Sequence, residues 1–278
     1  MEITAFTIHN PKYLQHHPIE EDYFLFNGER DRVILVVADG ITRDPVKTSW
    51  LPAFDDKEAI KKAVKNYPHP SPARLAAEMF CKVFVKEAKN FNKLQSLSTL
   101  FEKANSEIAK LNKELRVDYL ENDFGACVGA GAIIENNTLY WGFLTDCGIA
   151  IFDSEGNKKF QTLDEGPSKL IDREAEERKT SWRDPTWRAY ARKQYRNNPL
   201  EKNAYGAFTG ESNALHYLRT GTLKLEKGDF VVVYSDGMLP LLTGSTLIAH
   251  FSDLKETFKK NAEKIAGSEG TIVALQHS

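Results

Sequence analysis

Two strongly apolar segments of this sequence end in the same dipeptide. The first is RVILVVADG at residues 32–40 and the second is FVVVYSDG at residues 230–237. Runs of Val and Ile of this length are typical of buried strands. Asp-Gly is also a common turn dipeptide, because glycine accepts a positive φ and aspartate bonds its own backbone. A turn explains either pair alone, but the repeat raises the question of a shared role for Asp39 and Asp236.

The composition predicts a globular protein with length for one sizeable core or two small ones, and because no linker is evident we predict a single domain over residues 1–278. Of the 278 residues, 41% are hydrophobic and 27% are charged, which suffices for a sizeable core. A net charge of −2 argues against a general binder of nucleic acid or of anionic membranes. No apolar run is long enough to span a bilayer, and no signal peptide is visible. The three cysteines lie far apart and are predicted to be buried free thiols, which favours a cytoplasmic protein: Cys81, Cys127 and Cys147.

The first half of the chain is predicted to contain strands followed by helices. A helix N-terminus is indicated at Ser71, with Pro72 at the first helical position and a core face formed by Leu75, Met79, Val83 and Phe84. A second long helix would bury Leu100, Ala104, Ile108 and Leu111. The predicted elements are a strand at 3–8, a hairpin over 23–26 and 32–38, and helices over 55–67, 71–91 and 97–115.

The second half returns to strand periodicity. Its predicted strands are 124–134, 138–146, 148–153, a strand–turn–strand unit over 223–235, and 271–276; its predicted helices are 211–221 and 253–267, each ending at a glycine. Strands and helices therefore segregate along the chain. This order predicts an α+β fold.

Residues 161–205 do not follow the regular pattern and resemble a flap-like insertion over one end of the sheets. This segment is polar and highly charged, and Arg188, Arg192 and Arg196 would share one helical face. One interpretation is a basic, aromatic surface that recruits an acidic or phosphorylated partner. The other is a solvated amphipathic helix that packs Trp187 and Tyr190 on the body of the protein.

Acidic residues occur at the ends of several predicted strands. Carboxylates that converge there would repel one another and raise one another's pKa unless a cation neutralised them. Oxygen ligands without Cys or His indicate a hard cation, Mg²⁺ or Mn²⁺. Two such ions could activate a water for attack on phosphorus, with Asp39 as the natural bridging ligand and Gly40 allowing close approach. The residues are Glu21, Asp22, Asp39, Asp146, Asp236 and Glu269.

Taken in order, these segments resemble the type 2C metal-dependent protein phosphatases. The family's opening acidic pair corresponds to Glu21-Asp22, its first Asp-Gly to Asp39-Gly40 and its Ser-Asp-Gly to the segment around Asp236. A glycine-rich strand is matched by FGACVGAGAI, and Gly-Asp-Ser-Arg is matched only through Asp146. The resemblance covers nearly the whole chain, and it is the ordered set of motifs that is specific.

This resemblance implies a four-layer α-β-β-α sandwich with two antiparallel sheets flanked by helices. It also implies two Mg²⁺ or Mn²⁺ ions between the sheets, bridged by Asp39. Gly40 would contribute its carbonyl, Asp236 would bind one ion, and Glu21 and Asp22 would act mainly through water. Asp146 corresponds to a position that helps to hold a third ion in some members.

The sequence departs from the family at three places. His17 stands where an Arg often grips the substrate phosphate; it could bind phosphate or belong to a solvated loop, and Arg43 is the alternative phosphate ligand. The segment ITRD after Asp39-Gly40 replaces the family's usual residues. Near the C-terminus Ser268 replaces a ligand Asp, and Glu269 could reach the ion instead or could point to solvent.

The expected function is a metal-dependent hydrolase of phosphoserine and phosphothreonine in proteins, with a metal-activated water as nucleophile. Its partner would be a phosphorylated protein, with no nucleic acid and no membrane. The alternatives are a non-catalytic regulatory or scaffolding domain on the same fold and a small-molecule phosphomonoesterase.

Overall fold

The computed structural model describes most of the chain. The described residues are 2–14, 20–29, 32–41, 69–92, 96–116, 125–167, 169–181, 184–243, 251–267 and 269–278. The predicted helix over 55–67 lies outside these ranges, as do His17, Arg43 and Ser268.

Two antiparallel sheets of five strands each form the centre of the molecule. The first has the order β1-β10-β9-β6-β7 and the second has the order β2-β3-β4-β5-β8. The strands of the first sheet are β1 (Glu2–His9), β6 (Gly148–Phe152), β7 (Lys158–Gln161), β9 (Phe230–Tyr234) and β10 (Glu269–Gln276). Those of the second are β2 (Tyr23–Glu29), β3 (Arg32–Gly40), β4 (Cys127–Glu135), β5 (Thr138–Leu144) and β8 (Leu218–Lys224).

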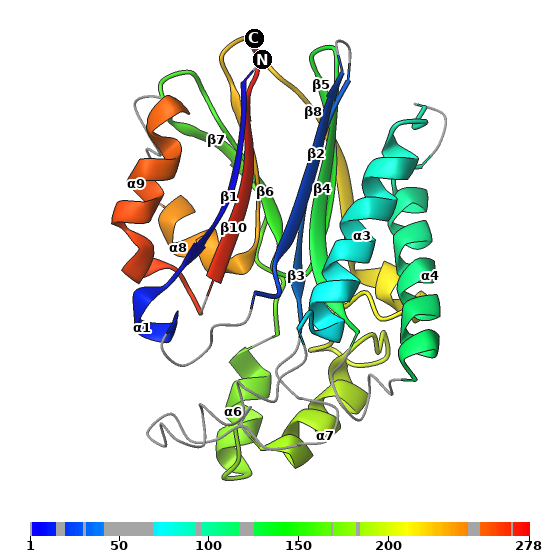
Figure 1. Cartoon of the computed structure of the whole chain (residues 1–278). Coiled ribbons are helices and arrows are strands. Elements are labelled where there is room, and N and C mark those ends of the chain that lie inside the picture. Colours follow the sequence, from blue (N-terminus) through cyan, green and yellow to red (C-terminus); the bar gives the residue numbers. More distant parts are fainter. Residues whose placement is uncertain are drawn as a thin grey trace.

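Helices cover the outer face of each sheet, so that the molecule has four layers (Figure 1). The helices α3 (Pro72–Ala88) and α4 (Ser98–Leu115) lie on the second sheet, and α8 (Leu239–Leu242) and α9 (Leu254–Lys260) lie on the first. The remaining helices are α1 (Pro11–Leu14), α6 (Lys169–Glu177) and α7 (Pro185–Tyr195), and short 3₁₀ turns cover Ser212–Tyr217, Asp236–Met238, Phe251–Asp253 and Ala262–Lys264. The predicted α-β-β-α sandwich is confirmed.

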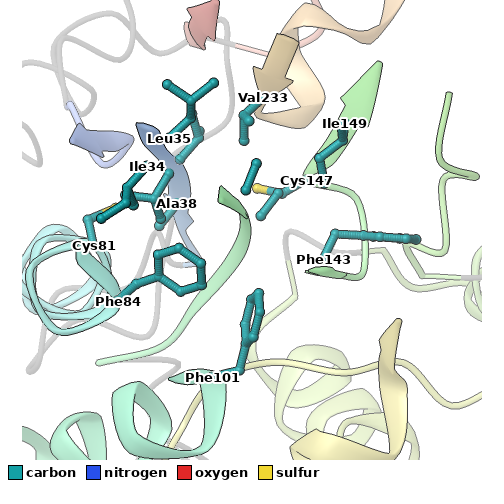
Figure 2. Close-up of a cluster of buried hydrophobic side chains, with 14 of the residues drawn as sticks. Ile34, Leu35, Ala38, Cys81, Phe84, Phe101, Phe143, Cys147, Ile149 and Val233 are labelled. Atoms are coloured by element: carbon teal, nitrogen blue, oxygen red, sulfur yellow. The ribbon is translucent and has the colours of Figure 1, made fainter. Parts of the chain in front are cut away.

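The packing of α3 and α4 on the second sheet depends on glycines in its strands. A Cβ at Gly129 would lie 2.6 Å from the Phe80 ring, and one at Gly131 would lie 2.4 Å from the Phe84 ring. Both rings belong to the largest core cluster, and Phe84 also meets Phe101 of α4 edge-on at 5.1 Å (Figure 2). The glycine-rich strand therefore serves packing: it leaves room for aromatic rings that a side chain would displace.

Most predicted strands and helices among the described residues are confirmed, but the helix predicted over 253–267 is confirmed only for α9, which ends at Lys260 and not at Gly267. Two further local interpretations are wrong. The segment 211–221 is not a helix, because Ser212–Tyr217 is a 3₁₀ turn and Leu218 starts β8. The two strands predicted within 223–235 do not pair, because β8 and β9 belong to different sheets. In both cases tertiary pairing decides between local structures of similar propensity.

The core-facing side of α3 also differs from the prediction. Leu75, Met79 and Val83 are only partly buried, whereas Phe80 and Phe84 are fully buried. Small residues on the same side as these rings bring the helix axis close to the sheet: Ala73, Ala76, Ala77, Cys81 and Ala88 are all buried. The second predicted helical face is nearly as expected, and Leu100, Ala104 and Ile108 of α4 are buried. Cys81, Cys127 and Cys147 are buried free thiols, as predicted.

Helices α6 and α7 lie beyond the end of the sheets opposite the chain termini (Figure 1). They form a small hydrophobic cluster of their own, apart from the clusters of the sandwich. Trp187 and Tyr190 pack with ring centroids 5.4 Å apart, and the Arg178 guanidinium lies 4.5 Å from the Tyr190 ring centroid. The cluster consists of Ile171, Ala175, Trp187, Ala191, Tyr195 and Tyr205, with Tyr190 against it.

In the described part of the chain, no helix has the length and apolar character needed to cross a membrane.

The contact between β4 and α3 generates a stability prediction. We expect Gly131→Ala to destabilise the protein by about 1–3 kcal/mol, because the new methyl group must displace the Phe84 ring. Chemical denaturation monitored by circular dichroism measures this change. Gly28→Ala is the matched control, since its Cβ would meet only Ile3 at an ordinary 3.4 Å. Equal stabilities of the two variants would contradict the packing argument.

Candidate active site

The acidic residues singled out in the sequence lie at the same end of the sandwich. Asp39 is the penultimate residue of β3, Asp146 follows β5 and Asp236 follows β9. Glu21 and Asp22 precede β2, and Glu269 starts β10. Because neighbouring strands are antiparallel, β3, β5 and β9 end where β2 and β10 begin (Figure 1). The convergence therefore follows from the strand order in the two sheets.

The Glu269 carboxylate links the two sheets at this end. Its Oε1 accepts hydrogen bonds from the backbone N–H groups of Glu21, at 2.6 Å, and Asp22, at 3.1 Å. Glu269 is only 9% exposed, so the alternative in which it points to solvent is wrong, and its predicted role as a metal ligand stays a prediction. Its other oxygen, Oε2, is buried and has no hydrogen-bond partner. The Glu269 carboxyl group thus positions the backbone of the acidic pair through Oε1, while Oε2 has no hydrogen bond.

Serine hydroxyls hold the side chains of the acidic pair. Ser71 caps α3 by accepting a hydrogen bond from the Arg74 N–H at 3.0 Å, and its hydroxyl donates to Glu21 Oε1 at 2.8 Å. Ser235 donates to Asp22 Oδ2 at 2.7 Å and accepts from the Thr271 N–H at 2.9 Å. Both acidic side chains are therefore oriented by groups from other elements.

Burial and mutual repulsion raise the pKa values of these carboxyls. Asp39 has its pKa raised well above the usual value by burial and by the negative charges of Asp22, Asp236, Asp146 and Glu269. The structure thus brings four of the predicted acidic residues within electrostatic range of Asp39, and the remaining one, Glu21, within range of Glu269.

Three acidic residues near Asp39 also have raised pKa values: Asp22, Asp146 and Glu269. Burial raises the pKa of Asp22 to about 6 against the lowering effect of Ser235, and it raises the pKa of Glu269 to about 9, reinforced by Asp22. Burial and the Asp236 charge raise the pKa of Asp146. Such a concentration of perturbed acids is typical of functional sites.

The donors suit a hard divalent cation by their chemistry. They are all carboxylates, and Asp146 Oδ1 and Glu269 Oε2 are buried oxygens without a hydrogen bond. Across the described ranges, however, no group of three or more His, Cys, Asp or Glu side chains is arranged so that it could hold a metal ion. Within these ranges the acids are therefore electrostatic neighbours and not a closed ligand shell.

Gly40 is required by the packing between β3 and α3. A Cβ at this position would lie 2.8 Å from the Ala73 carbonyl carbon, at the start of α3. Its close approach is therefore to the protein's own backbone, and this contact places the end of β3 beside the Ser71 cap. The predicted contribution of its carbonyl to a metal site stays a prediction.

The predicted basic recognition surface on α7 is wrong. Arg188, Arg192 and Arg196 are 6%, 2% and 3% exposed, so they cannot present a charged face to a partner. The alternative, a solvated amphipathic helix, is also wrong for the face that carries these three arginines, because that face is buried. Its prediction that Trp187 is buried is confirmed. The sequence pattern identified the shared face correctly, but charge alone did not reveal that this face packs inward.

A polar pocket of about 330 Å³ lies between the end of β5 and the segment that follows α7. Its wall includes an ion pair, in which Arg219 Nε and Nη2 each lie 3.0 Å from a carboxylate oxygen of Glu165. Lys202 and Arg219 in the lining of this pocket are exposed, in contrast to the buried Arg188, Arg192 and Arg196. The lining residues are Thr145, Glu165, Pro199, Glu201, Lys202, Ala204, His216, Tyr217 and Arg219.

Sequence reasoning missed the hydroxyl groups of the site. The sequence identifies Ser71 only as a helix cap and assigns no role to Ser235 or to Thr271, whose side chain also bonds Asp22. Ser235 is the residue before Asp236, and Thr271 lies two residues after Glu269. Hydroxyl residues beside acidic strand ends are the signal that was available, because a buried carboxylate needs such donors.

The fold is that of solved bacterial serine/threonine phosphatases. The S. agalactiae serine/threonine phosphatase has a TM-score of 0.60 and 15% identity over 100% of this chain and 99% of its own. The catalytic domain of the serine/threonine phosphatase PstP with two manganese ions has a TM-score of 0.56 and 13% identity, over 100% and 98%. RsbX in complex with magnesium has a TM-score of 0.54 and 12% identity, over 99% and 94%. No protein-family model matches the sequence, and no curated protein is similar to it.

These similarities define the class of fold. The chain has the α+β sandwich of the type 2C serine/threonine phosphatases along its whole length, which confirms the resemblance of the sequence motifs at the level of fold.

The raised pKa of Glu269 generates a prediction for the metal-free protein. Between its ordinary value of 4.5 and about 9, the folded state keeps a proton that the unfolded state has lost. Stability therefore falls as pH rises through this window, because the folded state binds more protons. We expect the Tm of the protein in EDTA to decrease between about pH 5 and about pH 8, and Mn²⁺ to raise it most at the higher pH.

Glu269→Gln is the control, because its amide oxygen can still accept both backbone N–H bonds but cannot titrate. Its Tm should depend less on pH than that of the parent. The same slope in both proteins would show that another group causes the effect.

Proposed function

We propose that this chain is a divergent type 2C phosphatase that hydrolyses phosphoserine or phosphothreonine in proteins and requires Mg²⁺ or Mn²⁺. The observation that carries the proposal is the shared electrostatic environment of Asp39, which is buried among the charges of Asp22, Asp236, Asp146 and Glu269. These residues come from both sheets of a fold found in serine/threonine phosphatases. A purely structural cluster of repelling acids would only destabilise the protein.

Each acidic residue has a proposed role. Asp39, with the Gly40 carbonyl, and Asp236 would hold two ions, Glu269 would complete the site, and Asp146 would hold a third, weaker ion. Glu21 and Asp22 would act through water, kept in place by their bonds to Ser71 and Ser235.

When bound, the divalent ions supply an activated water for attack on phosphorus and neutralise charge on the phosphate. Ser71 and Ser235 orient the Glu21 and Asp22 carboxyl groups by hydrogen bonds. The phosphate ligands His17 and Arg43 and a cytoplasmic location stay predictions. The partner would be a phosphorylated protein, with no role for nucleic acid.

The proposal predicts phosphopeptide hydrolysis that depends on Mn²⁺ and is abolished by EDTA. Asp39→Asn and Asp236→Asn should each reduce kcat/KM by at least about a hundredfold, because each removes a charged ligand. Asp253→Asn, which changes an exposed carboxylate, is the matched control. Release of phosphate from phosphoserine and phosphothreonine peptides measures the effect.

Full activity in EDTA, or near-normal turnover in Asp39→Asn, would refute the mechanism. Hydrolysis of a small phosphate ester without hydrolysis of any phosphopeptide would favour a small-molecule phosphomonoesterase.

A non-catalytic regulatory domain is the second candidate. The observation that favours it is the absence of a ready-made metal-binding group among the residues that the structure describes. This candidate predicts no binding of Mn²⁺ at millimolar concentration and no phosphatase activity, so that the same assays decide between the two.

A further inference from the structure

Thr145, the residue before Asp146, has an unusual backbone conformation. Its φ is +73°, in the left-handed region that side chains rarely adopt. The other non-glycine residues with positive φ in the described part of the chain are not β-branched: Arg116, Asn136, Lys179 and Asn197. A β-branched residue in this conformation is strained and persists only where its surroundings enforce it.

Two hydrogen bonds enforce the conformation of Thr145. Its hydroxyl donates to the Gly206 carbonyl at 2.6 Å, and its own carbonyl accepts from the Glu165 N–H at 2.9 Å. Thr145 is only 2% exposed, so water cannot replace these partners. Glu165 and Gly206 lie near the two ends of the segment 161–205, so this single residue is held from both ends of the predicted insertion.

The Gly206 carbonyl is itself firmly placed. A Cβ at Gly206 would lie 2.6 Å from the Tyr217 Cβ and 3.1 Å from the Leu144 side chain. On the other side, the bidentate pair with Arg219 anchors Glu165. Both partners of Thr145 are thus fixed by contacts to β5, β8 or the turn before β8.

The backbone conformation of Thr145 affects the position of the Asp146 carboxyl group. Its Oδ1 is buried without a hydrogen-bond partner, and its Oδ2 lies 3.3 Å from where a Cβ at Gly166 would be. The carboxyl group accepts a hydrogen bond from the backbone N–H of Asp146 itself, so its position follows the backbone of the turn that Thr145 and Asp146 form. Thr145 also forms part of the wall of the pocket that Lys202 and Arg219 line.

We infer that Thr145 is a positioning residue, through which the segment 161–205 sets the place of the Asp146 carboxylate. The role of Asp146 as a metal ligand rests on the proposed function; the mechanical link between the segment and the Asp146 turn does not.

The test compares Thr145→Ala with Thr145→Ser. Both variants lack the β-branched methyl group, and they differ only in the hydroxyl that bonds Gly206. In metal-free protein, amide hydrogen exchange measured by mass spectrometry should become faster in Thr145→Ala at residues 144–147 and 204–207. Thr145→Ser should exchange like the parent. Equal exchange in the two variants would overturn the inference.

Calorimetric titration with Mn²⁺ provides the second measurement. Thr145→Ala should weaken the weakest Mn²⁺ site by about tenfold, the effect of losing a group that orients a ligand, and Thr145→Ser should restore it. In an Asp146→Asn background, Thr145→Ala should have no further effect. A further loss in that background would show that Thr145 does not act through Asp146.

The two measurements separate the inference from the proposed function. A parent protein that binds no Mn²⁺ refutes the proposed function, and hydrogen exchange then decides alone whether Thr145 links the segment to the Asp146 turn.

Discussion

The acidic end of the sandwich depends on the carboxylate of Glu269. This group starts β10 of one sheet and accepts the backbone N–H groups of Glu21 and Asp22, which lead into β2 of the other. A buried carboxyl group is costly without donors, and the two bonds to Glu269 Oε1 bring the start of β10 to the residues that lead into β2. Together with Ser235, this link holds Asp22 within electrostatic range of Asp39.

The rest of the sandwich supplies the rigid frame for that link. Rings of α3 pack into spaces left by Gly129 and Gly131 of β4, so the helix lies close to the sheet. The same closeness brings the first residue before α3, Ser71, to Glu21. Helix capping, core packing and the orientation of an acidic side chain are therefore parts of one arrangement.

The segment 161–205 has a hydrophobic cluster of its own and also contacts the acidic end of the sandwich. Helices α6 and α7 pack around their own aromatic cluster, and the arginines of α7 are buried. The segment contacts the acidic end at Gly166, which lies beside Asp146, and at Thr145, whose strained backbone is held by Glu165 and Gly206.

The sequence by itself determined the class of fold and the identity of the acidic residues. Periodicity predicted the strands around Asp39 and Asp236, the order of the elements predicted an α+β fold, and the resemblance to the type 2C phosphatases implied the sandwich. These features are local, because a buried strand needs apolar residues wherever it lies. Only the tertiary structure decided that Leu218 begins a strand, that the arginines of α7 point inward, and that Ser71, Ser235 and Glu269 bond the acidic pair. Those outcomes depend on contacts between residues far apart in the chain, and hydrophobic periodicity carries no information about which distant groups meet.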